Sequence, residues 1–279
     1  MRNYDSDKIW LAPAKINLFL HITGQREDGY HELQTVFQFL NYADELRFTV
    51  LDHDEISHNN PLPGVKPEDD LTIRAARLLQ QHSNCPSGVK INISKRLPMG
   101  GGLGGGSSDA ATTLVALNQL WQLNLDMHSL AKLGVQLGAD VPIFIHGFAA
   151  WAEGVGEELS AIQLDEPWFV ILIPAVSVST AKIFSNPELK RDCPPISINS
   201  FLAGKGSNVC EPVVRALYPE VDQAVKWLNQ FSKARMTGTG ACVFAPTASE
   251  QDANKILSKL PAQFKGFIAQ GRNISPLYS

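Results

Sequence analysis

The 279-residue sequence has few cysteines, little net charge and no long apolar run. Its four cysteines are scattered without a C-x-x-C pair, which argues against a zinc site or disulfide framework and favours reduced thiols. Twenty-four basic and 28 acidic residues give a net charge of −4 without a block of one sign, so a nucleic-acid partner is not expected. The apolar run 168–173 is too short to span a membrane, and Met1–Asp7 has no apolar signal core. The sequence predicts a soluble, cytoplasmic protein without a membrane partner.

Strand and helix patterns mix along the chain without strict alternation. Alternating or apolar stretches predict strands at 9–22 (breaking at Gly24 and Asp28-Gly29), 33–40, 45–51, 89–93, 169–173 and 267–269, with a glycine-broken strand pair at 236–244. Helical spacing predicts helices at 71–81, 129–137, 213–217, 221–231 and 250–260. The proline-rich stretch around 187–195 is expected to be irregular. This mixture favours an α+β protein of two domains, 1–155 and 156–279, divided near residues 154–165.

Glycine is concentrated in one place: six of the eleven residues from Pro98 to Ser108 are glycine. Dense glycine costs conformational entropy, so it implies a backbone that must come close to a ligand. A helical pattern follows at once, with Ser107 or Ser108 expected as its N-cap. Free N–H groups of the loop and the positive end of the helix dipole would point the same way, which predicts a phosphate-binding site.

Several classes of protein use such a loop. A Walker A loop is excluded because no lysine follows the glycines, and a protein-kinase loop is excluded because the later kinase motifs are missing. A dinucleotide-binding fingerprint can be read at Gly100, Gly102 and Gly105, with Asp126 as its acidic residue, although Asp126 is more simply an N-cap. An NAD-dependent oxidoreductase and a non-catalytic phosphate-binding module therefore stay open on the residues alone.

Three polar residues have both a catalytic and a structural interpretation. Asp140 could accept a proton from an acceptor hydroxyl, but its spacing before Pro142 favours a helix cap. Lys15 lies in an apolar strand, where it needs an acidic partner or must extend to solvent. Asn17 shares the face of Lys15 and could hold substrate hydroxyls or be an ordinary buried amide.

Five segments together resemble one family. They are 12–18 (APAKINL), 28–33 (DGYHEL), 98–111 (PMGGGLGGGSSDAA), 137–142 (LGADVP) and 236–241 (MTGTGA). The chain resembles the galactokinase–homoserine kinase–mevalonate kinase (GHMP) superfamily. Within it, the chain is similar to the kinases that act on 4-diphosphocytidyl-2-C-methyl-D-erythritol in the non-mevalonate route to isoprenoids. The matching segments span nearly the whole chain.

The resemblance implies a two-domain GHMP-kinase fold with the active site in the cleft between the domains. It implies transfer of the ATP γ-phosphate to the 2-hydroxyl of the cytidyl substrate, with Asp140 as general base and Lys15 as its charge partner. Mg²⁺ is expected because it neutralises phosphate charge, but no residue is marked as a metal ligand. A monomer or weak homodimer is expected. The alternative within the superfamily is a kinase of homoserine or a mevalonate-like alcohol.

The resemblance also assigns binding residues. The residues expected around ATP are Leu71, Lys95, Pro98, Met99, Gly100, Gly101, Gly102, Leu103, Gly104, Gly105, Gly106, Ser107 and Ser108. The residues expected around the cytidyl substrate are Asn17, Tyr30, His31, Thr180 and Phe184. Tyr30 and Phe184 would stack on the cytosine, and His31 would hydrogen-bond its polar edge.

Overall fold

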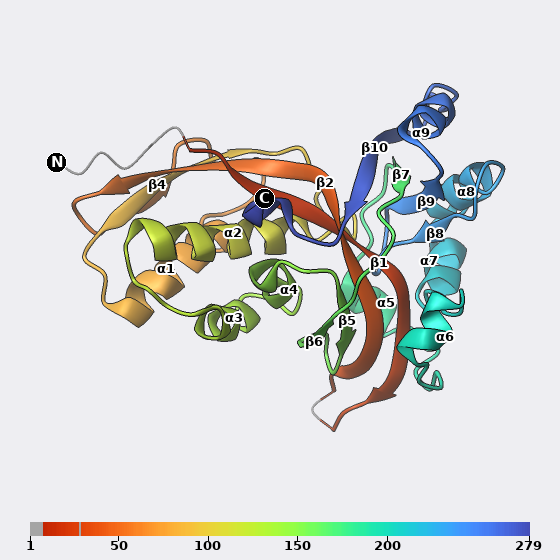
Figure 1. Ribbon diagram of the computed structural model, residues 1–279, viewed down its shortest axis with the longest axis horizontal. Helices are drawn as coiled ribbons and strands as arrows, with labels where there is room; N and C mark the ends of the chain where they lie inside the picture. Colours follow the sequence, from red (N-terminus) through yellow and green to blue (C-terminus); the bar gives the residue numbers. More distant parts are fainter. Residues whose placement is uncertain (1–7, 28) are drawn as a thin grey trace.

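A computed structural model describes residues 8–27 and 29–279 of the chain (Figure 1). Asp28 of the predicted turn and the N-terminal segment Met1–Asp7 lie outside the described residues. The strands are β1 (Trp10–Gln25), β2 (His31–Leu51), β3 (Ile56–His58), β4 (Gly88–Ser94), β5 (Ala150–Glu153), β6 (Glu158–Ala161), β7 (Trp168–Ile173), β8 (Arg235–Met236), β9 (Val243–Thr247) and β10 (Lys265–Arg272). The helices are α1 (Leu71–Ser83), α2 (Gly105–Leu120), α3 (Met127–Val135), α4 (Val141–His146), α5 (Thr180–Phe184), α6 (Ile198–Leu202), α7 (Glu211–Leu217), α8 (Pro219–Leu228), α9 (Glu250–Leu257) and the 3₁₀ helix η1 (Pro276–Tyr278).

The long antiparallel pair β1–β2 runs through both halves of the molecule (Figure 1). Within the described residues the sheet order is β3-β4-β2-β10-β7-β9-β8, while β1 pairs with β2 and β5 pairs with β2 and β6. Helices α1–α4 lie in one half of the molecule and α6–α9 in the other. β4, the strand before the glycine-rich loop, is antiparallel to β2 and parallel only to the short β3, which precedes it in the chain. Within the described residues, no strand that follows α2 pairs in parallel with β4, as a dinucleotide-binding unit requires. This topology does not support the dinucleotide-binding interpretation.

Two large apolar cores flank the middle of the sheet. The first gathers α1–α4 against β2 and β4, and the second gathers α7–α9 against β7 and β9. Leu20 and Ile22 near the end of β1 belong to the second core, whereas Trp10 and Ala12 near its start belong to the first. A smaller core that includes Ile16 lies along the middle of β1. The division at residues 155 and 156 stays a prediction.

Most predicted elements are present, with several corrections. The predicted strands 33–40 and 45–51 are one strand, β2, because the polar residues between them find hydrogen-bond partners on neighbouring segments. Asn41 Oδ1 accepts the Gln270 N–H at 2.7 Å, and Asp44 Oδ1 accepts the Leu97 N–H at 2.8 Å. β1 continues through Gly24 rather than breaking there. The short elements β3, β5, β6, α5 and α6 were not predicted, and α4 was indicated only by the possible cap at Asp140, because their residues are too few to form a periodic pattern.

The start of α2 differs from the prediction that Ser107 or Ser108 caps it. The N-cap residue is Gly104, in the left-handed conformation (φ 73°), and no side chain caps the helix. The first intrahelical hydrogen bond runs from the Ser108 N–H to the Gly104 carbonyl. Consequently the N–H groups of the first turn are left available to a ligand. By contrast, α1 has a side-chain cap: the Asp70 carboxylate accepts the N–H groups of Thr72 and Ile73.

None of the helices in residues 8–27 and 29–279 combines the length and apolar character that a membrane crossing requires.

Candidate active site

A cavity of about 960 Å³ opens between the β1–β2 pair, the glycine-rich loop and α5. Its wall includes most of the residues that the sequence singled out: Lys15, Asn17, Tyr30, His31, Leu71, Lys95, Pro98, Met99, Gly100, Gly101, Gly102, Gly104, Gly105, Gly106, Ser107, Asp140, Thr180 and Phe184. Two predicted residues are not part of this wall. Leu103 packs in the small central core, and Ser108 is fully buried.

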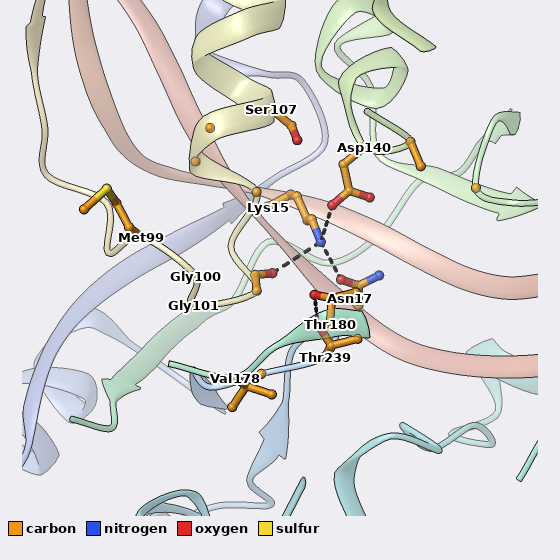
Figure 2. Close-up of a pocket in the computed structure, with 18 of the residues that line it drawn as sticks. Lys15, Asn17, Met99, Gly100, Gly101, Ser107, Asp140, Val178, Thr180 and Thr239 are labelled. Carbon is orange, nitrogen blue, oxygen red and sulfur yellow. Dashed lines mark hydrogen bonds and ion pairs between the residues drawn. The ribbon is translucent and has the colours of Figure 1, made fainter. Parts of the chain in front are cut away.

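Lys15 lies at the centre of the cavity wall and is only 3% exposed. Its ammonium group lies 3.2 Å from Asp140 Oδ2, and it donates to Asn17 Oδ1 at 2.7 Å and to the Gly102 carbonyl at 3.3 Å (Figure 2). An ammonium has three N–H donors, and each has an oxygen here. All three N–H donors of the buried Lys15 ammonium therefore have acceptors, and the ammonium holds the Asp140 carboxylate in place.

Asp140 occupies the N-cap position of α4, but its side chain makes no capping hydrogen bond. It points instead to Lys15, and about a third of the side chain (37%) is exposed. The structure therefore does not bear out the simple capping interpretation. A partly open carboxylate held by a buried cation can receive a proton from a molecule in the cavity.

Asn17 connects the two glycine-rich segments through hydrogen bonds. Its Nδ2 donates to Thr35 Oγ1 at 2.9 Å, and its backbone N–H donates to Thr237 Oγ1 at 2.9 Å. Thr237 Oγ1 in turn donates to the Gly102 carbonyl at 3.3 Å. The 237–242 segment, which joins the paired strands β8 and β9, is therefore packed directly on the glycine-rich loop.

The glycine-rich loop leaves no room for side chains at Gly101, Gly102 and Gly104. A Cβ on Gly102 would lie 2.4 Å from the Thr237 carbonyl oxygen, and one on Gly104 would lie 2.8 Å from the Phe144 ring. Both residues have a positive φ, 76° and 73°, which side chains disfavour. Here glycine brings the loop against Lys15 and the 237–242 segment.

Beneath the loop, Lys95 is held between two buried carboxylates. Its ammonium contacts Asp44 Oδ2 and lies 2.7 Å from Asp109 Oδ2. Burial raises the pKa of Asp109 to about 8, helped by the nearby Asp44 and opposed by Lys95. Burial alone would lower the pKa of Lys95, but Asp109 and Asp44 outweigh it and raise that pKa. The residues around Lys95 that were not predicted, Asp44 and Asp109, anchor the base of the loop.

A second polar cluster lies at the Leu71 end of the cavity. Thr72 donates to Asp70 Oδ1 through its N–H at 2.9 Å and its hydroxyl at 2.6 Å, and His58 Nε2 lies 3.1 Å from Asp70 Oδ2. Burial acts to raise the pKa of Asp70, but the hydrogen bonds from His58 and Thr72 lower it to about 2. The cluster holds the start of α1, and with it Leu71, at the cavity wall.

The opposite end of the cavity has an aromatic wall. The rings of His31 and Phe184 lie with centroids 5.0 Å apart and planes at 33°, and Tyr30 is 64% exposed. Thr180 and Thr239 share a hydrogen bond of 2.9 Å between their hydroxyls, which joins α5 to the 237–242 segment (Figure 2). A flat, partly exposed wall of this kind suits a planar ring.

Arg191 is a residue that sequence reasoning missed. It lies behind the aromatic wall, where its Nε donates to His31 Nε2 at 3.2 Å. No pattern in the sequence marks it, because it sits in an irregular stretch and bonds mainly to backbone carbonyls. Burial, and next the charge of Arg191, lower the pKa of His31.

The residues that could contact a metal ion are few. In residues 8–27 and 29–279, no three or more His, Cys, Asp or Glu side chains gather into a candidate metal site. The oxygens of Ser107 and Asp140 face the same space in the cavity (Figure 2). This suits a cation that takes most of its oxygens from a ligand such as a phosphate chain.

Comparison with known proteins identifies the fold and the family. The model of the GHMP kinase N-terminal domain matches residues 70–148, and that of the GHMP kinase C-terminal domain matches residues 195–266. The chain is 59% identical to the 4-diphosphocytidyl-2-C-methyl-D-erythritol kinase of Nitrosococcus oceani over 96% of both chains. It belongs to this family of GHMP kinases.

Other relatives agree with this assignment. The kinase of the same description from Shewanella halifaxensis is 54% identical over 96% of this chain and 95% of its own. A crystal structure of 4-(cytidine 5′-diphospho)-2C-methyl-D-erythritol kinase has a TM-score of 0.83 and 31% identity, covering 95% of this chain and 99% of that one. The predicted α+β GHMP-kinase fold is confirmed, and the protein is a small-molecule kinase of a superfamily that uses ATP as phosphate donor.

Proposed function

We propose that the protein transfers the γ-phosphate of ATP to the 2-hydroxyl of 4-diphosphocytidyl-2-C-methyl-D-erythritol. The observation that carries the proposal is the Lys15–Asp140 pair at 3.2 Å, which lines one cavity with the glycine-rich loop and the aromatic wall. The names of the relatives support this choice of acceptor. On this account, the reaction is a step in the non-mevalonate route to isoprenoids.

The two ends of the cavity suit the two substrates. At one end, the uncapped N-terminus of α2 offers N–H groups and a positive dipole to the phosphates of ATP. The adjoining Lys95, Met99 and Leu71 would border the rest of the nucleotide. At the other end, Tyr30, His31 and Phe184 would receive the cytosine.

Phosphoryl transfer depends chiefly on positioning and on stabilising charge. The acceptor hydroxyl would lie beside Asp140, which would take its proton as the new P–O bond forms. Lys15 holds Asp140 in place and adds a positive charge near the transferred phosphate. Asn17 Oδ1 accepts from Lys15, and one N–H of its Nδ2 donates to Thr35. Its other N–H and its other lone pair would hydrogen-bond the acceptor.

Mg²⁺ would be held mainly by the ATP phosphates. It would neutralise the negative charge that builds up on them during transfer. Ser107 and Asp140 are the side chains whose oxygens are suitably placed to contact it (Figure 2).

The test is ADP release by the purified protein with ATP and Mg²⁺, comparing the cytidyl substrate with homoserine, mevalonate and galactose. The proposal expects ADP release above background only with the cytidyl substrate. Release with another alcohol would keep a GHMP kinase but reject the proposed acceptor. A protein that binds ATP and releases no ADP with any acceptor would instead be a non-catalytic binding module.

A further inference from the structure

Arg191 reaches two parts of the aromatic wall at once. Its Nε donates to His31 Nε2 at 3.2 Å, and its NH2 group donates to the Phe184 and Asn186 carbonyls at 2.6 and 2.9 Å. Its NH1 group donates to the Leu189 carbonyl at 3.0 Å. The guanidinium is half-buried and held by three carbonyls near the end of α5, so it has little freedom to leave the imidazole.

This contact decides which ring nitrogen of His31 carries the proton. A guanidinium can only donate hydrogen bonds, so His31 Nε2 must accept and carries no proton. A neutral imidazole then has its proton on Nδ1. Among the described residues, no partner of His31 Nδ1 is found, so this N–H is available on a ring that lines the cavity.

We infer that Arg191 is a positioning residue that fixes His31 as a hydrogen-bond donor toward the base of the acceptor substrate. This inference rests on the proposed function. A donor at this point complements a ring nitrogen that accepts, such as N3 of cytosine, which carries no hydrogen. It opposes uracil, whose N3 carries one. Arg191 would therefore contribute to the choice of a cytidyl over a uridyl substrate.

Charged groups around His31 are few. Glu32 follows it on β2 and is paired with Arg26 at 3.5 Å, and Tyr30 is the adjacent phenol. Arg191 is the charge, among the described residues, that shifts the pKa of His31. Without it the ring would take up a proton more readily. An imidazolium donates from both nitrogens, so at low pH it would regain the Nδ1 donor without help from Arg191.

The variant Arg191→Met tests the inference through this pH dependence. At pH 8 it is expected to raise KM for the cytidyl substrate about five- to tenfold, because only the roughly 10–20% of rings protonated on Nδ1 would then bind, with KM for ATP changed less than about twofold. At pH 6 the increase should shrink to about twofold. A KM increase of equal size at both pH values would mean that Arg191 only anchors α5, and would overturn the inference.

The variant His31→Asn is a matched background that separates an effect of Arg191 through the imidazole from a general effect on α5. In His31→Asn, the amide nitrogen takes the place of Nδ1 as a donor that needs no tautomer to be fixed. Adding Arg191→Met to His31→Asn should therefore change KM less than about twofold. A full five- to tenfold increase in this background would contradict the inference, because the effect would not depend on the imidazole.

The tautomer can also be read directly, without turnover. Nitrogen-15 NMR of the folded wild-type protein should show His31 protonated on Nδ1, and Arg191→Met should shift the ring toward a mixture of tautomers. A wild-type ring protonated on Nε2 would reject the inference even if the enzyme acts on the cytidyl substrate. Conversely, an Nδ1-protonated ring in a protein without activity on that substrate would reject the proposed function alone.

Discussion

Lys15 and Asp140 lie 125 positions apart in the sequence and meet as an ion pair of 3.2 Å at the cavity wall. The lysine is buried, whereas the aspartate is partly exposed to the cavity. The difference in exposure suits their proposed tasks. A cation that positions a carboxylate is best held rigidly, and a carboxylate that takes a proton must reach the substrate.

The close approach of Gly104 to Lys15 gives a first prediction. In Gly104→Ala, the new Cβ would lie 2.8 Å from Phe144 and 3.1 Å from Lys15 Cε, so the variant should lose stability and displace Lys15. Gly64→Ala is a matched control, because Gly64 also has a positive φ (76°) but meets no atom within 4 Å. The control should lose roughly 1–2 kcal/mol by urea unfolding and keep its kcat. Gly104→Ala should lose more and show a kcat at least about tenfold lower. Equal behaviour of the two variants would contradict the proposed close packing.

The Lys95 cluster gives a prediction about stability. Lys95→Met would leave the carboxyl groups of Asp44 and Asp109 buried without a cation, which should reduce the free energy of unfolding by about 3–5 kcal/mol. Asp109→Asn keeps the uncharged state that burial favours, so it should change that free energy by no more than about 1 kcal/mol. Urea unfolding of both variants at pH 7 checks this, and a Lys95→Met loss as small as that of Asp109→Asn would refute it.

The low pKa of Asp70 predicts that the stability of the folded protein depends on pH. Its pKa is about 2 in the folded protein and 3.8 without the fold, so its contacts stabilise the folded state above pH 4 and lose their effect as pH falls from 4 toward 2. The contribution is roughly 2 kcal/mol at pH 7, of which about 1 kcal/mol should be lost by pH 3. Asp70→Asn keeps a capping oxygen but cannot ionise. Between pH 7 and pH 3, the wild type should therefore lose about 1 kcal/mol more unfolding free energy than Asp70→Asn. Parallel losses in the two proteins would argue against the low pKa.

The exposed residues Tyr30 and Met99 form a matched pair at opposite ends of the cavity. They are 64% and 65% exposed, so truncating either should barely affect folding. Tyr30→Ala should raise KM for the cytidyl substrate about tenfold or more, the effect of a lost stacking contact, with KM for ATP unchanged. Met99→Ala should raise KM for ATP instead. Steady-state kinetics with each substrate varied in turn distinguishes the two ends. If Tyr30→Ala left the cytidyl KM intact, the base would bind elsewhere.

Much of this site could be predicted from the sequence because its residues lie in short, distinctive segments. The glycine-rich loop, Lys15, Asn17 and Asp140 each stand in such a segment, and all line one cavity. Their pairing across 125 positions depends on the fold, so only the family resemblance supplied it. From spacing alone, Asp140 was expected to be a helix cap.

The missed features share a physical cause. Arg191 binds mainly backbone carbonyls, and Asp44 binds the N–H groups of Arg96 and Leu97, so no side-chain periodicity reveals either residue. The serine cap predicted for α2 was wrong because a capping serine is favoured only where a side chain must accept the free N–H groups of the first turn. Here the helix starts at glycine and its N–H groups are left for a ligand.

The most direct test of the account compares ADP release by the wild type and by Asp140→Asn, with saturating ATP, Mg²⁺ and the cytidyl substrate. Asparagine keeps the size of the side chain but cannot take the proton, so turnover should fall by roughly 10²–10⁴-fold. The thermal shift on adding ATP should stay close to that of the wild type. A folded Asp140→Asn protein that turns over at nearly the wild-type rate would contradict the role of Asp140 as general base.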